Sequence, residues 1–417
     1  MTNRYETLDH YLSVCKLHKK EESKLITKVL EKYTDIEPKV RLEKSDLSSS
    51  LNLRGNNYFL NNIKLNNDDA FCLYHALRLN SWVSILDLRY NRINDEGAVW
   101  IAKLIAENST LKHLNLMCND IGPDGAEQIA LALQKNENII YLNLNGNKIG
   151  NKGGMCMAQM LQVNVNLQHL DIGETDLKIE SLIALATILN YNRTLKSLNV
   201  SRPVPQYQFA NWMDEIAQHF AKMLKVNKTL KQLIMQKYEL RDYGMHWISD
   251  KLLSNPHLVH LDLSCNRITR DGAKDISILL NRNTPLKVLD LGYNRLEDDG
   301  AKLLAEALSY ANTNLQKLSI KSNNIGAEGL CALAECLNHN TSLTHVYIWG
   351  NNLEEPACIA FKKLIEKNKL KQENTDVRPY VVDGKTYLSE LTNDIDMFYY
   401  WQPVYGDGVL STLREIA

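Results

Sequence analysis

One short pattern recurs ten times along this chain, and it limits the fold more than any other feature of the sequence. The pattern is apolar-x-x-apolar-x-apolar-x-x-Asn-x-apolar, where x is any residue. Its copies follow one another at 28 or 29 residues, apart from one spacing of 35. The central apolar residues are Leu86, Leu114, Leu142, Leu170, Leu198, Leu233, Leu261, Leu289, Leu318 and Val346. A period this regular is typical of a stacked solenoid, whose usual product is one long binding surface.

Each copy predicts a strand, a loop and a helix. Leu86 and Leu88 alternate with a polar residue, which is the period of a strand. Asn91 is expected to turn its amide onto backbone groups of the loop, so that stacked copies form an asparagine ladder. After Gly97, apolar residues recur on one face of a helix. The strands should therefore form a parallel sheet inside an arc, with the wider helices outside.

These residues resemble a known family. The period and the Leu-x-x-Leu-x-Leu-x-x-Asn-x-Ile…Gly-Ala pattern are similar to those of ribonuclease-inhibitor-like leucine-rich repeat proteins. That class includes ribonuclease inhibitor, the Ran GTPase-activating protein and the repeat arrays of NOD-like receptors. The resemblance implies an α/β leucine-rich repeat solenoid, a horseshoe with a parallel β-sheet on the concave face and helices on the convex face. It says little about function, because the matching residues are the buried ones.

The repeats divide the chain into three parts. Residues 46–370 hold the ten clear repeats and one degenerate copy that contains Leu51 and Leu53. Residues 1–45 predict a helical cap, which a solenoid needs to cover its first apolar face. Residues 371–417 predict a hairpin with Asp383-Gly384 at its turn and an aromatic segment at 397–405. That aromatic segment is either a cap on the last repeat or a docking motif for a partner.

Composition narrows the range of partners. The chain has 48 Lys and Arg against 49 Asp and Glu, a net charge of −1, so we expect no nucleic-acid partner. No stretch is apolar enough to span a membrane, and the first residues lack the apolar core of a secretion signal. The eight cysteines form no Cys-x-x-Cys pair and have no histidine at zinc-ligand spacing. We therefore expect a cytoplasmic monomer without metal or cofactor.

Candidate partner-binding residues come from the strands and the loops that follow them. The sheet-face column after each central leucine is mostly Asp and Asn, either as solubilising residues or as contacts to a partner. Exposed aromatic residues on a rigid sheet are common anchors of interfaces. The candidates are Arg89, Tyr90, Tyr141, Arg202, Tyr207, Trp212, Tyr293, Tyr347 and Trp349.

The middle of the array departs from the pattern. Thr175, Pro203 and Tyr238 replace the asparagine in three successive repeats, and the spacing of 35 residues falls there. Proline has no N–H and no side-chain amide, so residues 201–212 are expected to form a projecting loop. Such a loop either carries function or is a tolerated insertion.

The favoured hypothesis is a non-enzymatic scaffold that binds a protein through its concave face and its irregular middle loop. Resemblance to the Ran activator implies an alternative, a GTPase-activating protein with Arg202 or Arg89 acting on a nucleotide held by its partner. No hydrolase, zinc-protease or phosphate-loop motif occurs in the sequence. Solitary arrays rich in Asn, Lys and Ile also resemble effectors that intracellular bacteria deliver into the cytosol of a host cell.

Overall fold

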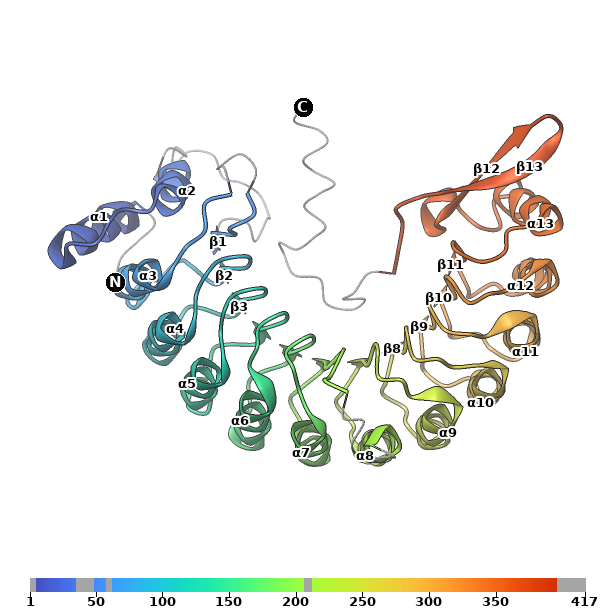
Figure 1. Cartoon of the computed structure of the whole chain (residues 1–417), viewed down its shortest axis with the longest axis horizontal. Coiled ribbons are helices and arrows are strands. Elements are labelled where there is room, and N and C mark those ends of the chain that lie inside the picture. Colours follow the sequence, from blue (N-terminus) through green and yellow to red (C-terminus); the bar gives the residue numbers. More distant parts are fainter. Residues whose placement is uncertain (1–4, 35–48, 58–61, 206–211, 396–417) are drawn as a thin grey trace. The chain divides into compact units, whose positions relative to one another are not determined.

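The computed structural model describes residues 5–34, 49–57, 62–205 and 212–395. It divides into two compact units whose boundary lies between Leu198 and Asn199. Each unit repeats one motif, a three-residue strand followed by a helix (Figure 1).

The N-terminal unit begins with two helices, and its strands then alternate with helices. The elements are α1 Glu6–His18, α2 Lys24–Thr34, β1 Ser50–Asn52, α3 Asn67–Leu77, β2 Ile85–Asp87, α4 Asp95–Glu107, β3 His113–Asn115, α5 Pro123–Leu133, β4 Tyr141–Asn143, α6 Gly150–Val163, β5 His169–Asp171, α7 Ile179–Leu189 and β6 Ser197–Asn199, which crosses the boundary.

The C-terminal unit continues the same alternation and ends in a hairpin. Its elements are α8 Trp212–Val226, β7 Gln232–Ile234, α9 Arg241–Leu252, β8 His260–Asp262, α10 Arg270–Asn281, β9 Val288–Asp290, α11 Glu297–Tyr310, β10 Lys317–Ser319, α12 Ala327–His339, β11 His345–Tyr347, α13 Glu355–Glu366, the 3-10 helix η3 Gln372–Asn374, β12 Val377–Val382 and β13 Lys385–Glu390.

Strand register reproduces the sequence period. Leu86 pairs with Leu114 and Leu114 with Leu142 in parallel strands, so each central leucine stacks on the next. The same alignment joins Leu261 to Leu289 in the C-terminal unit. Among the described residues, the strands β1 to β11 follow chain order in the sheet. The expected α/β leucine-rich repeat solenoid, with a parallel sheet on one face and helices on the other, is confirmed.

The degenerate first repeat forms a true strand. Leu51 of β1 pairs with Leu86 of β2, and Leu51 and Leu53 are fully buried.

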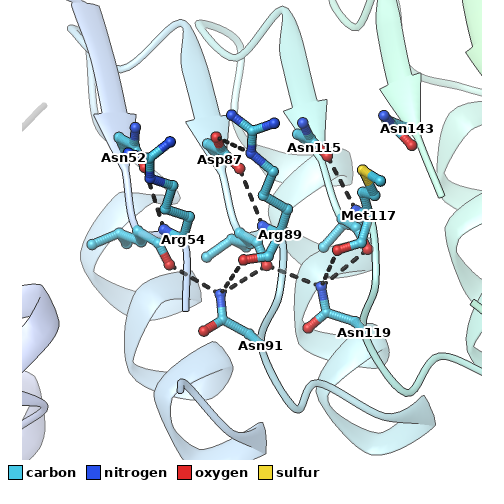
Figure 2. Close-up of polar contacts among 12 residues, drawn as sticks. Asn52, Arg54, Asp87, Arg89, Asn91, Asn115, Met117, Asn119 and Asn143 are labelled. Carbon is cyan, nitrogen blue, oxygen red and sulfur yellow. Dashed lines mark hydrogen bonds and ion pairs between the residues drawn. The ribbon is translucent and has the colours of Figure 1, made fainter. Parts of the chain in front are cut away.

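Asparagine side chains hold successive loops together (Figure 2). Asn91 Nδ2 donates to the carbonyl oxygens of Leu53 and Leu88 at 3.0 and 2.8 Å, and its Oδ1 accepts from Leu65 N at 2.8 Å. Asn119 repeats this arrangement one strand later, with bonds to Leu88 and Leu116. The asparagine ladder thus satisfies loop groups that could not reach water, as the sequence predicted.

A second set of asparagines bonds backbone groups of neighbouring repeats at the other end of the strands. Asn108 Nδ2 donates to Leu77 O at 2.7 Å, and its Oδ1 accepts from the backbone N–H groups of Thr110 and Leu111. Equivalent bonds to the preceding helix end are made by Asn136, Asn164, Asn192, Asn255, Asn312 and Asn340.

The helices α5, α10 and α12 each receive a cap from an aspartate of the repeat before it: Asp95, Asp242 and Asp298. Asp95 Oδ1 accepts from the backbone N–H groups of Gly122 and Gly125 at 2.6 and 2.9 Å, at the start of α5. An acceptor there satisfies free N–H groups and suits the positive end of the helix dipole. A Cβ at Gly125 would lie 2.6 Å from that carboxylate oxygen, which explains the glycine that recurs at this position.

The ladder changes in the middle of the array. Thr175 Oγ1 donates only within its own repeat, to Ile172 O at 2.6 Å. Tyr238 is fully buried, and its phenol donates to Val200 O at 2.7 Å, so a tyrosine makes the bond that asparagine makes elsewhere.

Both ends of the array carry added elements. At the start, Thr7 Oγ1 of α1 accepts from Asn80 Nδ2 and Trp82 Nε1 at 3.1 and 2.9 Å. At the end, β12 and β13 form an antiparallel hairpin against α13, with positive φ at Asp383 and Gly384 in its turn. Thr375 bridges Val346 as a short extension of the sheet.

Among the described residues, no helix has the length and apolar content that crossing a membrane requires.

Candidate functional site

The polar column on the sheet face is engaged with its own backbone. In most repeats the Asp or Asn that ends the strand accepts a hydrogen bond from the N–H two residues later. Figure 2 shows this bond for Asn52, Asp87 and Asn115, at 3.3, 3.1 and 3.1 Å. The same bond occurs at Asn143, Asp171, Asn199, Asp262 and Asp290. Side-chain bonds of this kind are typical of Asx turns, which end strands.

Tyr347 cannot make this bond at the last strand, and another residue replaces it. Asp376 is fully buried, and its carboxylate accepts from the N–H groups of Ile348 and Trp349 at 2.8 and 3.0 Å. The backbone N–H groups that follow the last strand are therefore satisfied by an acidic side chain from outside the repeats.

Arg89 forms a buried ion pair on the sheet face of the N-terminal unit. Its Nε lies 3.0 Å from Asp87 Oδ2, and Arg89 is 4% exposed (Figure 2). Burial raises the pKa of the Asp87 carboxyl, and Arg89 opposes that rise. The Arg89 guanidinium is therefore paired with Asp87 and buried. This geometry does not support Arg89 as an exposed contact to a partner or as an arginine that acts on a nucleotide.

Two carboxyl groups on neighbouring strands of the C-terminal unit affect each other. Burial, followed by the charge of Asp262, raises the pKa of Asp290 to about 8. Burial also raises the pKa of Asp262, while the amide of Gln236 donates to it. At neutral pH this part of the sheet face holds a protonated carboxyl and resists further negative charge.

In all ten repeats, the residue at which the chain turns away from the sheet face has a left-handed backbone conformation. We call these residues the edge column: Tyr90, Cys118, Gly146, Glu174, Arg202, Lys237, Cys265, Tyr293, Ser322 and Gly350, with φ between 50° and 83°. Only glycine adopts this region without a steric cost. Three of the candidate partner-binding residues, Tyr90, Arg202 and Tyr293, belong to this column.

Backbone hydrogen bonds fix the edge column in place. Tyr90 N donates to Met117 O at 2.9 Å, and Tyr293 N donates to Lys321 O at 2.7 Å. The side chains nevertheless differ in exposure, since Tyr293 is 57% exposed and Tyr90 is half-buried. Tyr293 is thus an exposed aromatic residue whose backbone is fixed at the rim of the sheet.

The remaining candidates are less accessible than expected. Tyr347 is 2% exposed, so the expectation that it is an exposed aromatic residue is wrong, and Trp349 is half-buried. Tyr141 is buried and its phenol accepts from Asn143 Nδ2 at 3.2 Å. Side chains in adjacent parallel strands are only about 4.8 Å apart, so even face residues cover one another.

The irregular middle segment is described in part. Arg202 is exposed, whereas Trp212 is buried at the first position of α8 and cannot anchor a partner there without movement. Tyr207 lies outside the described residues, so its role stays a prediction.

The hairpin presents exposed aromatic residues that the sequence analysis did not select. Tyr380 and Tyr387 stack with ring centroids 5.5 Å apart, and both are exposed. The alternation of Tyr387 with the buried Thr386 and Leu388 is the signal that could have identified it, and Tyr380 is its cross-strand partner.

The described residues contain no group of three or more His, Cys, Asp or Glu that could hold a metal ion. Burial raises the pKa of the Cys118 and Cys265 thiols in the edge column. Both are therefore thiols at neutral pH, poor nucleophiles compared with a thiolate.

Comparison with known proteins agrees with this architecture. A family model described as "Leucine Rich repeat" matches residues 79–102, 107–130, 135–158, 254–277, 282–305 and 311–334. "Leucine-rich repeat-containing protein 34" of Rattus norvegicus is 45% identical over 210 residues, 50% of this chain and 50% of that protein. The Homo sapiens protein of that name is 42% identical over 210 residues, 50% of this chain and 44% of its own length. The chain therefore spans about half the length of the curated relatives it matches.

A solved structure supports the fold alone. The structure titled "Crystal structure of Rad7 and Elc1 complex in yeast" superposes with a TM-score of 0.53 at 15% identity and covers 91% of each chain. Repeat period and strand register agree with these matches, and the chain has the fold of a leucine-rich repeat solenoid.

Proposed function

We propose that this chain is a non-enzymatic scaffold that binds a protein partner through its sheet face and edge column, with Tyr293 as the main anchor. Leucine-rich repeat proteins are typically protein-interaction scaffolds, and a solenoid offers an extended surface rather than an enclosed site. A cytoplasmic monomer remains part of this proposal.

One observation carries the proposal. Tyr293 stands where the backbone is left-handed, with φ 59°, while Gly146 and Gly350 occupy the equivalent position in other repeats. Strain of this kind is typical of positions whose side chain serves a purpose. An exposed tyrosine on a fixed backbone has only two side-chain torsions to order on binding, which suits an anchor.

The test measures the affinity of a captured protein partner for the unchanged chain and for its variants by titration. Tyr293→Ala should weaken binding by roughly 2 kcal/mol, about thirtyfold, because anchor aromatics dominate interface energies. Tyr243→Ala is the matched control, since Tyr243 is also exposed in the C-terminal unit but lies on the helix α9. Equal affinities for Tyr293→Ala and the unchanged chain would refute Tyr293 as the anchor.

No described contact favours the GTPase-activating alternative over the scaffold. Arg202 is the accessible arginine of the two considered, and it remains a candidate contact in the scaffold proposal. Delivery into a host cell as an effector stays a prediction.

A further inference from the structure

Two cysteines on different helices of the N-terminal unit face each other. Cys15 belongs to α1 and Cys72 to α3, and these two helices pack together (Figure 1). Both side chains are buried, with exposures of 0% and 1%. The two thiols lie within hydrogen-bonding reach of each other. The helix that begins the chain's cap therefore meets the first helix of the repeat array through a pair of thiols.

Contacts at the two ends of α1 place this pair independently of the thiols. Near the start of α1, Thr7 Oγ1 accepts from Asn80 Nδ2 at 3.1 Å. Just beyond its end, Lys20 Nζ lies 2.6 Å from Asp68 Oδ1. The two helices therefore run antiparallel. One cysteine follows Thr7 by eight residues and the other precedes Asn80 by eight residues, so this register sets them opposite each other.

Other side chains keep this interface closed. Tyr11 and Val14 are buried together with Cys15, at the i, i+3, i+4 spacing that forms one face of a helix. Beside them, the rings of His18 and His75 stack with centroids 5.0 Å apart. Both thiols are therefore shielded from large reagents while α1 lies on α3.

Burial also controls the reactivity of the pair. Burial, followed by the charge of Cys15, raises the pKa of the Cys72 thiol to about 12. The thiolate is the form that attacks an oxidant, so Cys72 is unreactive at neutral pH while the helices are together. Terminal elements of a fold open locally more often than its core does. Oxidation of the pair is therefore limited by the opening of α1.

A peroxide supplies the oxidising equivalents for a disulfide. When α1 opens, an exposed thiolate attacks one oxygen of hydrogen peroxide, the O–O bond breaks, and a sulfenic acid and hydroxide form. When α1 returns, the second thiol attacks the sulfenic sulfur, and the S–O bond breaks with release of water. The hydroxide takes up the proton of the second thiol's partner step, so two thiols and one peroxide give one disulfide and two water molecules. Thiols in contact on facing helices need only a small approach to reach the roughly 2 Å of this bond.

We propose that Cys15 and Cys72 form a redox-sensitive pair, which peroxide joins in a disulfide that locks the cap helix α1 onto α3. The reduced chain can release α1, whereas the oxidised chain holds it against the first repeat. This inference does not depend on the proposed binding of a partner.

The test treats the folded full chain with hydrogen peroxide and maps the disulfides by mass spectrometry without reduction. Trypsin releases Cys15 within residues 5–16 and Cys72 within residues 65–78, so their disulfide joins two peptides of known mass. This link should be at least about tenfold more abundant than any other cysteine link, because contact gives each thiol a high effective concentration of the other.

Hydrogen exchange measures the effect on α1. The α1 amides should exchange at least about tenfold more slowly in the oxidised chain, and dithiothreitol should restore the rate of the reduced chain. Cys15→Ala and Cys72→Ala should each abolish both the link and the slower exchange. Cys331→Ala is the matched control, since Cys331 is a half-buried cysteine of α12 in the C-terminal unit, and it should change neither. Circular dichroism checks that each variant remains folded.

Four results would overturn the inference. The first is the absence of the link between Cys15 and Cys72 in the oxidised chain. The second is an equal share of this link after oxidation in urea, which would assign it to chance pairing of cysteines. The third is equal exchange of the α1 amides in the reduced and oxidised chains. The fourth is a link confined to disulfide-bonded dimers, which would place the two thiols on different copies of the chain.

Discussion

A side chain in the left-handed region costs roughly 1–2 kcal/mol relative to glycine, and eight of the ten edge-column residues are not glycine. The cost recurs because the backbone must turn out of each strand at the same place. Glycine would relieve it at every repeat, as it does at Gly146 and Gly350. The identity of the side chain at these positions is therefore governed by something other than the stability of the turn.

Tyr293→Gly should make the chain more stable. Relief of the left-handed strain outweighs the extra freedom of the unfolded chain, for a net gain of about 0.5–1 kcal/mol. Thermal unfolding measures the change. The control is Tyr243→Gly within α9, which should destabilise by about 1 kcal/mol because glycine is unfavourable inside a helix. A loss of stability in both variants would show that Tyr293 makes packing contacts that exceed its strain.

Asp290 should make the stability of the chain fall as pH rises. Its folded pKa is raised to about 8 from an ordinary 3.8, so between these values the folded chain holds a proton that the unfolded chain releases. Stability rises with pH only where the unfolded state binds more protons, and here it binds fewer. The stabilisation from protonated Asp290 is complete below the unfolded pKa and is lost as pH passes about 8.

Asp290→Asn tests this dependence. Asparagine retains an oxygen that accepts from Gly292 N, a bond of 2.8 Å in the native chain, but it does not ionise. Melting temperatures across the range from pH 5 to pH 9 should fall less steeply for the variant than for the unchanged chain. Asp383→Asn at the exposed hairpin turn is the control and should leave the slope unaltered. Parallel profiles for Asp290→Asn and the unchanged chain would contradict the prediction.

Hydrogen bonds between loops, rather than loop packing alone, hold neighbouring repeats in register. A substitution at Tyr238 measures the stabilisation from one of these hydrogen bonds, because phenylalanine has nearly the same shape as tyrosine but lacks the hydroxyl. Tyr238→Phe should destabilise by about 1–3 kcal/mol, since it leaves the buried Val200 carbonyl without its 2.7 Å donor. Urea unfolding measures the loss, and Tyr380→Phe on the exposed hairpin should change stability by less than about 0.5 kcal/mol. An equal effect at both positions would mean that the Tyr238 bond contributes nothing of its own.

The regular elements could be predicted because they depend on buried residues with a fixed period. Each expected leucine lies in its strand, and the asparagine ladder satisfies the loop as the pattern implied. The replacement by Tyr238 could not be foreseen, since the sequence shows only that asparagine is missing there. A phenol reaches Val200 only because the backbone brings the two within range.

The candidate site was harder to predict, because strand periodicity gives the direction of a side chain and not its exposure. Tyr347 and Tyr141 point to the expected face but are covered by neighbours. The left-handed edge column did have a signal, namely the glycines at 146 and 350 in equivalent repeat positions. The hydrogen bonds from Ile348 and Trp349 to Asp376 had no sequence signal, because Asp376 lies in a segment outside the repeat period.

At the scale of the whole molecule, repeats stabilise mainly their nearest neighbours, so cooperativity depends on unbroken ladders within each unit. The asparagine of the repeat is absent at Thr175 and Pro203, close to the boundary between the two compact units. We therefore expect urea to unfold the chain in two transitions rather than one. Matched variants can assign them: Asn119 and Asn294 each donate to two carbonyl oxygens at 2.9 to 3.0 Å, one in each unit.

Asn119→Ala should shift only one of the two transitions, and Asn294→Ala only the other, each by about 1–3 kcal/mol, because each variant leaves buried groups unpaired. Hydrogen exchange of the strand amides identifies which unit opens in each step, since amides report local unfolding separately from global unfolding. If both variants shifted one shared transition by the same amount, the missing asparagines at Thr175 and Pro203 would not reduce the cooperativity of unfolding. The array would then be a single cooperative body in spite of its irregular middle.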